Sequence, residues 1–368
     1  MVQDAAGRAA VPVNLQRAVK RAVLTGLRRS GGFAACRALT RRGLRILCYH
    51  GISLADEHVF NGQLFMRPAL FRARMRRLVD SGFTVLPLGP AIEALREGRL
   101  PDRAVVLTFD DGWYGIYRHA LPVLAELRLP ATLYVTTYYV ERRTPVFNVA
   151  VHYLFWAARV AYLDVSLLSV GLTGRYDLSD PAQRRAAAQA VEAHGDERLS
   201  SSERQTLLLA LARHLGVDPA LLGEQRVCGL MSPDEVAAAA AAGVDIQLHT
   251  HRHTLPSGQH AAFIREIADN RASLGRMTPA PLIHLCYPSG VYHPRSWPWL
   301  EELGIETATT TRPGLNYRDG KRFELFRFLD GEHIGEIEFD AEMAGALEIS
   351  RRLRGTVKRI PGRPPDRT

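Results

Sequence analysis

The chain has few cysteines and no long apolar run, and each absence excludes a class of protein. Its 368 residues include only four cysteines, and no two of them form a CxxC pair. The sequence therefore predicts neither a disulfide framework nor a zinc ribbon, and a reducing compartment is the simplest expectation. No run of 18 apolar residues occurs, so no membrane-spanning helix is predicted. With 46% apolar and 23% charged residues, the chain is expected to fold around a sizeable core.

Acidic residues are scarce at both ends of the chain. Residues 1–45 carry ten Lys and Arg and one acid, and residues 351–368 carry seven and one. The intervening residues hold thirty basic and thirty-six acidic side chains, so the excess positive charge belongs to the ends. A nucleic-acid-binding domain more often carries its basic residues on the domain itself, so no nucleic-acid partner is predicted. Basic ends on an acidic body indicate either contact with an anionic surface, such as membrane headgroups, or solvated tails.

The first 45 residues also lack the apolar core of a secretory signal. Lys and Arg interrupt their apolar residues, and no small-residue cleavage site follows. Residues 15–29 have the pattern of a basic amphipathic helix, a type that can lie on a membrane surface. We therefore expect a cytoplasmic protein, or one held peripherally on the cytoplasmic face of a membrane.

From residue 44 onward, short apolar runs alternate with stretches of helical periodicity. The strand-like runs lie at 44–49, 83–88, 104–109, 131–136, 244–248, 282–286 and 307–311. Helical periodicity lies at 69–80, 117–127, 232–242, 261–275 and 295–303. This alternation is typical of parallel βαβ units. It predicts an α/β fold, a barrel of seven or eight such units, with a doubly wound sheet as the alternative.

Residues 141–230 interrupt this alternation. They contain an aromatic helix, an alternating stretch at 165–178 that resembles a hairpin, and two more helices, the second opened by a Ser200-Ser-Ser-Glu203 capping box. We interpret this segment as an inserted, mostly helical subdomain that serves either as a substrate lid or as a packing element. The predicted organisation is an N-terminal basic amphipathic extension, a split barrel, the insertion, and a C-terminal extension with a basic tail, at 1–43, 44–140 with 231–330, 141–230 and 331–368.

The strongest local motif is Leu107-Thr-Phe-Asp-Asp-Gly112, in which a strand-like run ends in two adjacent carboxylates. Side chains at the carboxyl ends of barrel strands line the mouth, where active sites form. Of two adjacent acids there, one can bind a metal and stay ionised while the other accepts a proton. A plain strand-end turn with an Asp-Gly pair is the alternative.

Three histidines fall within five residues in His249-Thr-His-Arg-His253, directly after another strand-like run. His249 and His253 are four residues apart, so one helical turn would place both imidazoles on one side and turn His251 elsewhere. With one aspartate they would form a facial triad with open positions, which suits Zn²⁺ and a bound water. Zinc lowers the pKa of such a water to about 7 and polarises a carbonyl oxygen.

A third motif, Leu285-Cys-Tyr-Pro-Ser-Gly290, also lies at the end of a strand-like run. Its Pro and Gly fix a loop whose backbone N–H groups can stabilise a tetrahedral oxyanion. Taken alone, the pattern fits a structural turn equally well.

In this order, the three motifs resemble those of the polysaccharide deacetylase family, the NodB-homology domain or carbohydrate esterase family 4. The family's T-F-D-D-G matches Thr108–Gly112 in full, and its H-[ST]-x-x-H matches at His249, Thr250 and His253. Its third motif, R-x-P-[FY]-[GS], retains Pro288 and Gly290 but lacks the Arg and the aromatic. The resemblance implies a distorted (β/α)7–8 barrel, a divalent metal that is zinc-like, and hydrolysis of N-acetyl groups on amino sugars.

Carried over by position, the resemblance makes Asp110 the general base and makes Asp111, His249 and His253 the metal ligands. Thr250 would support the histidine loop by hydrogen bonding. The oxyanion and substrate loop would consist of Tyr287, Pro288, Ser289 and Gly290, with the Ser289 N–H facing the oxyanion. Because the family's Arg is missing, Arg327 in Leu325-Phe-Arg-Phe328 is the candidate that orients Asp110, with an ordinary surface Arg as the alternative.

The general acid is assigned through Cys48-Tyr-His-Gly51, which follows the first strand-like run. It resembles the Y-H of an exopolysaccharide and biofilm-glycan deacetylase branch, in which the acid His comes from this N-terminal position. His50 is therefore the candidate acid, with a buried structural His as the alternative. His333 is closer to the C-terminal position from which the family's acid usually comes, and it is the second candidate for the general acid.

These patterns together predict a metal-dependent hydrolase that removes N-acetyl groups from an amino sugar. The expected partner is an N-acetylated glycan or a lipid-linked sugar precursor, and the expected cofactor is a divalent metal, Zn²⁺. One alternative is a hydrolase of the same fold that cleaves another non-peptide C–N bond, such as a cyclic amide. The other is a non-catalytic glycan-binding protein, against which the intact Asp110, Asp111, His249 and His253 argue.

Overall fold

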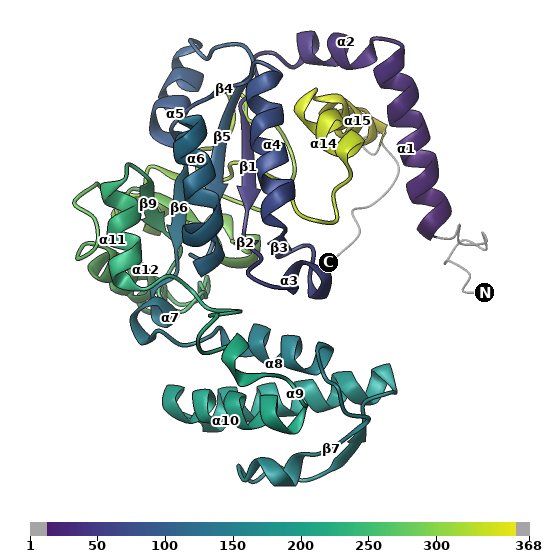
Figure 1. The fold of residues 1–368 in the computed structure, drawn as a ribbon. Helices are drawn as coiled ribbons and strands as arrows, with labels where there is room; N and C mark the ends of the chain where they lie inside the picture. The colour runs from purple at the N-terminus through teal and green to yellow at the C-terminus, as the bar shows by residue number, and fades with distance from the viewer. Residues whose placement is uncertain (1–12, 358–368) are drawn as a thin grey trace.

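A sheet of eight parallel strands forms the centre of the molecule (Figure 1). The structure is a computed structural model and describes residues 13–357. The strands are β1 (Arg45–Tyr49), β4 (Thr84–Val85), β5 (Ala104–Phe109), β6 (Thr132–Val135), β9 (Asp245–Leu248), β10 (His284–Cys286), β11 (Thr307–Thr309) and β12 (Phe328–Leu329). Their order is β11-β10-β9-β6-β5-β1-β12, with β4 also paired to β5.

The segment before β12 links the two ends of this sheet. β12 pairs with β1, whereas the residues just before it bond to β11 and its continuation: Leu325 N–H donates to Ala308 O and Arg327 N–H to Arg312 O. The sheet therefore curves around instead of ending in two separate edges. This confirms the predicted distorted (β/α) barrel over an open doubly wound sheet.

Helices lie between successive strands on the outside of the sheet, and the stretches with helical periodicity are confirmed as helical. They form α4 (Pro68–Asp80), α6 (Leu121–Leu127), α11 (Pro233–Ala241), α12 (His260–Leu274) and α13 (Trp297–Glu302). The predicted strand at 83–88 is wrong for most of its length, because only Thr84–Val85 pairs and Leu88 begins α5 (Leu88–Glu97). α5 buries Leu88, Ala91, Ile92 and Leu95, which is helical spacing.

Alternation along the strands divides the core into two parts. All six residues of β5 are buried, as expected for a parallel strand covered on both faces. Val105, Leu107 and Phe109 join the large core under the outer helices. Ala104 and Val106 join a smaller cluster with Tyr134 of β6, Cys286 of β10 and the apolar side of α5. This smaller cluster lies on the inner face of the strands, whose carboxyl ends form the barrel mouth.

Residues 141–230 form a helical layer beyond the carboxyl ends of the strands (Figure 1). α8 (Phe147–Trp156) packs against α9 (Pro181–Arg198) and α10 (Ser201–His214), and α7 (Thr137–Arg142) leads into the layer from β6. The capping box at Ser200 and Glu203 is confirmed. The hairpin is displaced from 165–178: β7 (Tyr162–Asp164) pairs with β8 (Arg175–Asp177), because Asp164 accepts from the Ser166 N–H and starts a turn at 165–168.

The two ends of the described chain pack together on one side of the barrel. α1 (Val13–Arg29) and α2 (Gly32–Leu39) share a small core with α14 (Glu336–Met343) and α15 (Ala346–Val357). Lys20 pairs with Glu338 and Arg28 with Asp340, so α14 neutralises part of the basic charge of α1. Among the described helices, none has the length and apolarity needed to cross a bilayer. The remaining strands and α-helix are β2 (Gly51–Ile52), β3 (Phe65–Met66) and α3 (Glu57–Phe60).

Candidate active site

Asp110 and Asp111 follow β5 directly, and the backbone between them sends their side chains to different neighbours. The Asp110 N–H continues the sheet by donating to Tyr49 O at 2.9 Å. Asp111 has a left-handed backbone, with φ of 70°, which ends the strand. Asp110 then contacts Arg327 and Asp111 contacts two histidines.

Arg327 holds Asp110 with both ends of its guanidinium. Nη1 donates to Oδ1 and Nη2 to Oδ2, each at 2.7 Å, and both side chains are buried. This is the bidentate geometry in which a charge-assisted pair is strongest. Burial acts to raise the pKa of the Asp110 carboxyl, but the Arg327 guanidinium outweighs it and holds that pKa below its usual range. Asp110 is therefore ionised and fixed in orientation.

Two cysteine thiols complete the surroundings of Asp110, and the sequence reasoning missed both. Cys48 Sγ and Cys286 Sγ each lie 3.4 Å from Asp110 Oδ2, and Arg327 Nη2 lies 3.1 Å from Cys286 Sγ. Cys286 occupies the place of the Arg in the family's third motif, so a small side chain stands where a guanidinium is expected. The signal in the sequence is that Cys48 is the second-last residue of one predicted strand and Cys286 the last of another, two residues before His50 and Pro288 respectively.

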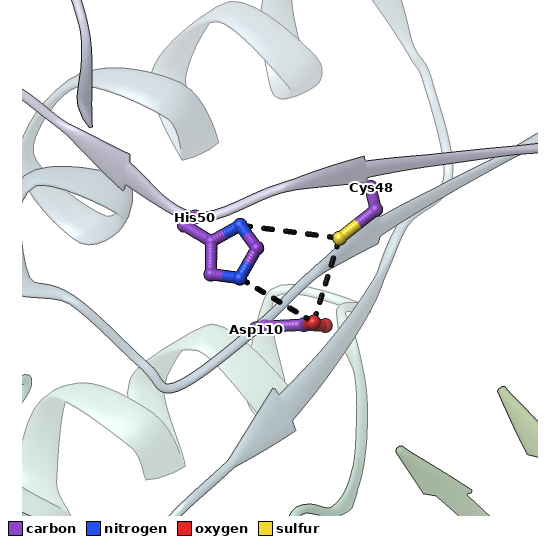
Figure 2. A group of neighbouring side chains, drawn as sticks. All are labelled: Cys48, His50 and Asp110. Atoms are coloured by element: carbon purple, nitrogen blue, oxygen red, sulfur yellow. Dashed lines mark hydrogen bonds and ion pairs between the residues drawn. The ribbon is translucent and has the colours of Figure 1, made fainter. Parts of the chain in front are cut away.

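His50 lies at the same mouth, directly after β1. Its Nε2 is 3.8 Å from Asp110 Oδ2 and its Nδ1 is 4.0 Å from Cys48 Sγ, as Figure 2 shows. Its side chain is 18% exposed, compared with 2% for Asp110, so it is the more accessible of the two. His333 is exposed, and its Nδ1 donates to Gly62 O. Within residues 13–357, no contact joins His333 to either aspartate.

Asp111, His249 and His253 converge on one point. Asp111 Oδ1 lies 3.1 Å from His249 Nε2 and 3.3 Å from His253 Nε2. Burial acts to raise the pKa of Asp111, but hydrogen bonds from the two imidazoles hold it well below its usual range. The three ligand atoms lie within 4.8 Å of one another, and one carboxylate with two imidazoles is a donor set that suits a divalent cation.

Neighbouring groups orient these ligands. His249 Nδ1 donates to Cys286 O at 2.9 Å, which leaves Nε2 as the nitrogen that faces Asp111 and that would coordinate a cation once the imidazole is neutral. Trp113 Nε1 donates to Asp111 Oδ2 at 2.7 Å, which leaves Oδ1 for the histidine side. Cys48 with His50, and Cys286 with His249, also lie near Asp110. Both Asp110 oxygens already accept from Arg327, so these groups suit a cation less well.

The histidine loop is not the helical turn that the spacing suggested. Residues 249–253 are irregular, and both Thr250 (φ 62°) and His253 (φ 55°) are left-handed, which brings the two imidazoles together by a different route. His251 points away, as predicted, and its Nδ1 bonds to Thr137 Oγ1 at 2.8 Å.

The hydrogen-bonding role predicted for Thr250 is wrong. Its hydroxyl is buried and has no hydrogen-bond partner among the described residues. Asn270 and Thr136 support the loop instead: Asn270 Oδ1 accepts from the His249 N–H at 3.0 Å, and Thr136 Oγ1 donates to His251 O at 3.1 Å.

The loop after β10 reaches the same edge of the barrel. Ser289 is left-handed, with φ of 55°, and Pro288 is buried. Gly290 also has positive φ, and a Cβ there would overlap the Thr311 side chain, so only glycine fits. Tyr287 turns out of the site, because its hydroxyl donates to Phe323 O at 3.0 Å and its ring stacks on Tyr292.

A cavity of about 590 Å³ opens beside the metal-ligand candidates. The barrel contributes Asp111, Trp113 and His253, and α7 contributes Tyr138 and Tyr139. Residues 141–230 contribute Asn148, Asp196 and Arg204 to the lining. The volume lies within the range of about 300–1,000 Å³ typical of ligand pockets.

Comparison with known proteins adds a sequence match and a fold match. The family model described as polysaccharide deacetylase matches residues 97–308. The poly-β-1,6-N-acetyl-D-glucosamine N-deacetylase of Escherichia coli K12 is 31% identical over 90 residues, which are 24% of this chain and only 13% of that relative.

Two solved structures share the architecture at low identity. The Streptococcus pyogenes deacetylase PplD, in complex with acetate, superposes with a TM-score of 0.54 at 18% identity, over 82% of this chain and 98% of the other. IcaB from Ammonifex degensii superposes with a TM-score of 0.51 at 18% identity, over 83% and 97%. At this identity the likeness shows the fold.

Proposed function

The chain belongs to the polysaccharide deacetylase family, and on that premise we propose that it hydrolyses N-acetyl groups of an amino sugar in a glycan. The observation that carries this proposal is the pairing of two different carboxylate sites at one barrel mouth. Asp110 is bound to Arg327, and Asp111 faces His249 and His253. A metal-assisted hydrolase needs both a proton acceptor and a cation site at this spacing.

Asp111, His249 and His253 are our candidates to hold a divalent cation, with Zn²⁺ as the first choice because two imidazoles and a carboxylate suit it. When bound, such a cation acts as a Lewis acid that polarises a carbonyl and acidifies a nearby water. The protein's own contribution is to fix the ligands through the Cys286 carbonyl and the Trp113 indole.

Asp110 is our candidate for the general base. Arg327 keeps it ionised, so it can accept a proton from the water that adds to the acetamide carbonyl carbon. Arg327 also fixes both carboxylate oxygens, which restricts the direction from which the proton arrives. We therefore assign Arg327 a positioning role.

His50 is our candidate for the general acid. In the second half of the reaction the C–N bond breaks, and the leaving nitrogen must take a proton before it departs as an amine. The His50 imidazole lies 3.8 Å from Asp110 and is partly exposed, so it lies near enough to the base to protonate the same substrate. The Ser289 N–H is the proposed donor to the oxyanion.

The substrate class follows from the relatives. The E. coli relative is named for a poly-β-1,6-N-acetyl-D-glucosamine, and the streptococcal deacetylase was solved with acetate, which is the second product of the proposed reaction. We propose an N-acetylated glycan or a lipid-linked precursor for this chain.

We also propose peripheral contact with an anionic membrane through α1. Val19 and Val23, four residues apart, are 54% and 63% exposed. Arg17 and Arg21 are exposed on the same helix, whereas Lys20 and Arg28 are paired with α14. An apolar pair among basic side chains suits an interfacial helix.

Acetate release from a panel of substrates tests the proposed function. The panel contains N-acetylated saccharides, lipid-linked sugars and a cyclic amide. We expect acetate from the sugars, its loss with a chelator and its return with Zn²⁺. Cleavage of the cyclic amide alone, or binding of saccharides without any turnover, would replace deacetylation with one of the alternative functions.

A further inference from the structure

The cavity beside Asp111 has one wall that the barrel does not supply. Asn148 of α8, Asp196 of α9 and Arg204 of α10 line it together with Asp111 and His253. All three belong to residues 141–230, the helical layer beyond the strand ends in Figure 1. The layer therefore reaches the place where substrate must lie.

This wall is anchored to the rest of the molecule. Tyr138 of α7 shares a hydrogen bond with Ser201 of α10 at 2.9 Å, and Tyr153 of α8 donates to Asp56 at 2.6 Å. Two separate hydrogen bonds thus tie the helical layer to the barrel side. The geometry favours a fixed wall over a lid that swings away.

Arg204 is held rigidly within the wall. Its Nε donates to Gly195 O at 2.9 Å and to Leu199 O at 3.2 Å, at the end of α9, and its guanidinium lies over the Phe147 ring. Asp196 Oδ1 lies 3.2 Å from Arg204 Nη1 while its side chain stays 51% exposed. The Asp196 carboxylate is therefore positioned by Arg204 and still has acceptor capacity toward the cavity.

The other polar group of the wall is unused. Asn148 is exposed, and among the described residues its side-chain amide makes no hydrogen bond. Trp113, Tyr138 and Tyr139 also line the cavity, and the two tyrosines are the more exposed of the three. Aromatic side chains can bind the apolar face of a sugar ring, and amide and carboxylate groups can bind its hydroxyls.

We propose that Asn148 and Asp196 form a saccharide-binding wall that recognises sugar hydroxyls next to the reacting N-acetyl group. The proposal rests on the proposed function for the location of the reacting group. The cavity is larger than an acetamide group needs, which leaves room for the sugar that carries this group, so an N-acetylated saccharide is the ligand class of this proposal. Asn148 and Asp196 are specificity-determining residues in this assignment, and Arg204 positions Asp196.

The test uses Asn148→Ala, Asp196→Ala and the double variant. Matched controls are Gln189→Ala and Glu197→Ala, which change exposed residues of α9 outside the cavity. Calorimetric binding of N-acetylglucosamine oligosaccharides of one to four units is measured, together with kcat and KM for their deacetylation. Hydrolysis of an aryl acetate, which carries no sugar, reports on the catalytic groups alone.

Each single variant should weaken oligosaccharide binding and raise KM roughly three- to tenfold, with kcat and aryl acetate hydrolysis unchanged. The double variant should bind oligosaccharides more weakly than either single variant, and both controls should bind them as the parent protein does. Unchanged binding in the double variant would overturn the proposal while leaving the deacetylase function standing. If the parent binds oligosaccharides but releases no acetate, the proposed function fails, and the binding comparison still decides the role of the wall.

Discussion

Asp110 and Asp111 are neighbours in sequence but occupy opposite surroundings. Asp110 is 2% exposed, and it is enclosed by Arg327, Cys48 and Cys286. Asp111 is 8% exposed and lines the cavity beside two imidazoles. Both carboxyls have lowered pKa values despite burial, one through a guanidinium and the other through histidines. The same residue type is thus prepared for two roles by its partners.

The difference shows that backbone geometry, as well as residue type, decides which neighbours each carboxylate contacts. The left-handed backbone at Asp111 is what separates the two side chains. Arg327 occupies both oxygens of Asp110, whereas Trp113 occupies one oxygen of Asp111 and leaves the other toward the ligand candidates. Each prediction below changes one side of this comparison.

The largest expected effect is on the Asp111 side. Asp111→Ala should remove both the bound metal, about one equivalent per chain, and all deacetylation, because it deletes the carboxylate of the proposed ligand set. Asp110→Asn is the matched variant, which should retain metal and lose turnover. Metal content and acetate release are measured on both proteins. An empty site in Asp110→Asn would show that the two roles are not separate.

On the Asp110 side, Arg327→Ala should destabilise the fold. It leaves a buried carboxylate without its partner, which typically costs about 3–5 kcal/mol. Denaturant unfolding measures this, and Arg322→Ala, which breaks an exposed pair with Glu301, is the control at about 0–1 kcal/mol. If Arg327→Ala lowered the unfolding free energy no more than the control does, the Arg327–Asp110 pair would contribute no more stability than an exposed ion pair.

His50→Ala tests whether the group beside Asp110 is the acid. We expect the variant to fold, to keep metal and to lose activity by roughly 10²–10⁴-fold. His333→Ala, at an exposed position, should change little. Near-normal acetate release from His50→Ala would place the acid elsewhere.

Asp330 is a third buried aspartate that sharpens the comparison. It also pairs with an arginine, but Arg74 gives it only Nε at 3.1 Å and directs Nη2 to Ile334 O. Burial then dominates and raises the pKa of Asp330 to about 6 from 3.8. Because the folded pKa is raised, the associated stability is complete below about pH 4 and is lost as the pH rises through about 6.

Unfolding free energies from pH 4 to 7 check this pH dependence. The difference between the parent protein and Asp330→Asn should decrease by at most about 3 kcal/mol as the pH rises over this window. A difference that increases with pH would show that Arg74 lowers the pKa of Asp330 as Arg327 lowers that of Asp110.

The smallest expected effect lies far from the mouth, on α1. A Val19→Asp, Val23→Asp double variant should bind anionic vesicles roughly tenfold more weakly, because it removes the exposed apolar pair and adds negative charge. Val59→Asp, at another exposed valine, is the control. Point changes are preferable to truncation, since α1 and α2 share a core with α14 and α15. Equal binding of all three proteins would refute membrane contact through this helix.

The sequence was sufficient for the fold and for the placement of its motifs, because parallel strands bring their carboxyl ends to one edge. Asp110, Asp111 and His249 each follow a run that is a strand in the structure. Arg327 was harder to place, since β12 has only two residues and Arg327 itself interrupts the apolar residues around that strand. Its role depends on the ring of strands closing, which no local pattern reports.

The details of the loops could not be read from spacing. The four-residue spacing of His249 and His253 suggested a helical turn. In the structure, left-handed backbone at Thr250 and His253 brings the two imidazoles together instead. Thr250 fits the motif, but its hydroxyl forms no hydrogen bond with the described residues. The loop is held instead by Asn270, twenty-one positions beyond His249. Long-range contacts of this kind follow from the packed fold and leave no trace in nearby residues.

The left-handed backbone at Asp111, Thr250, His253 and Ser289 has a consequence for heat tolerance. Each such non-glycine residue costs on the order of 1–3 kcal/mol, and the surrounding packing must offset it. The mouth is therefore expected to be the first part of the barrel to lose its shape on warming, before the strands separate. Ser289→Gly would relieve one of these costs, so a more heat-tolerant protein could be obtained there at the expense of a more mobile loop after β10.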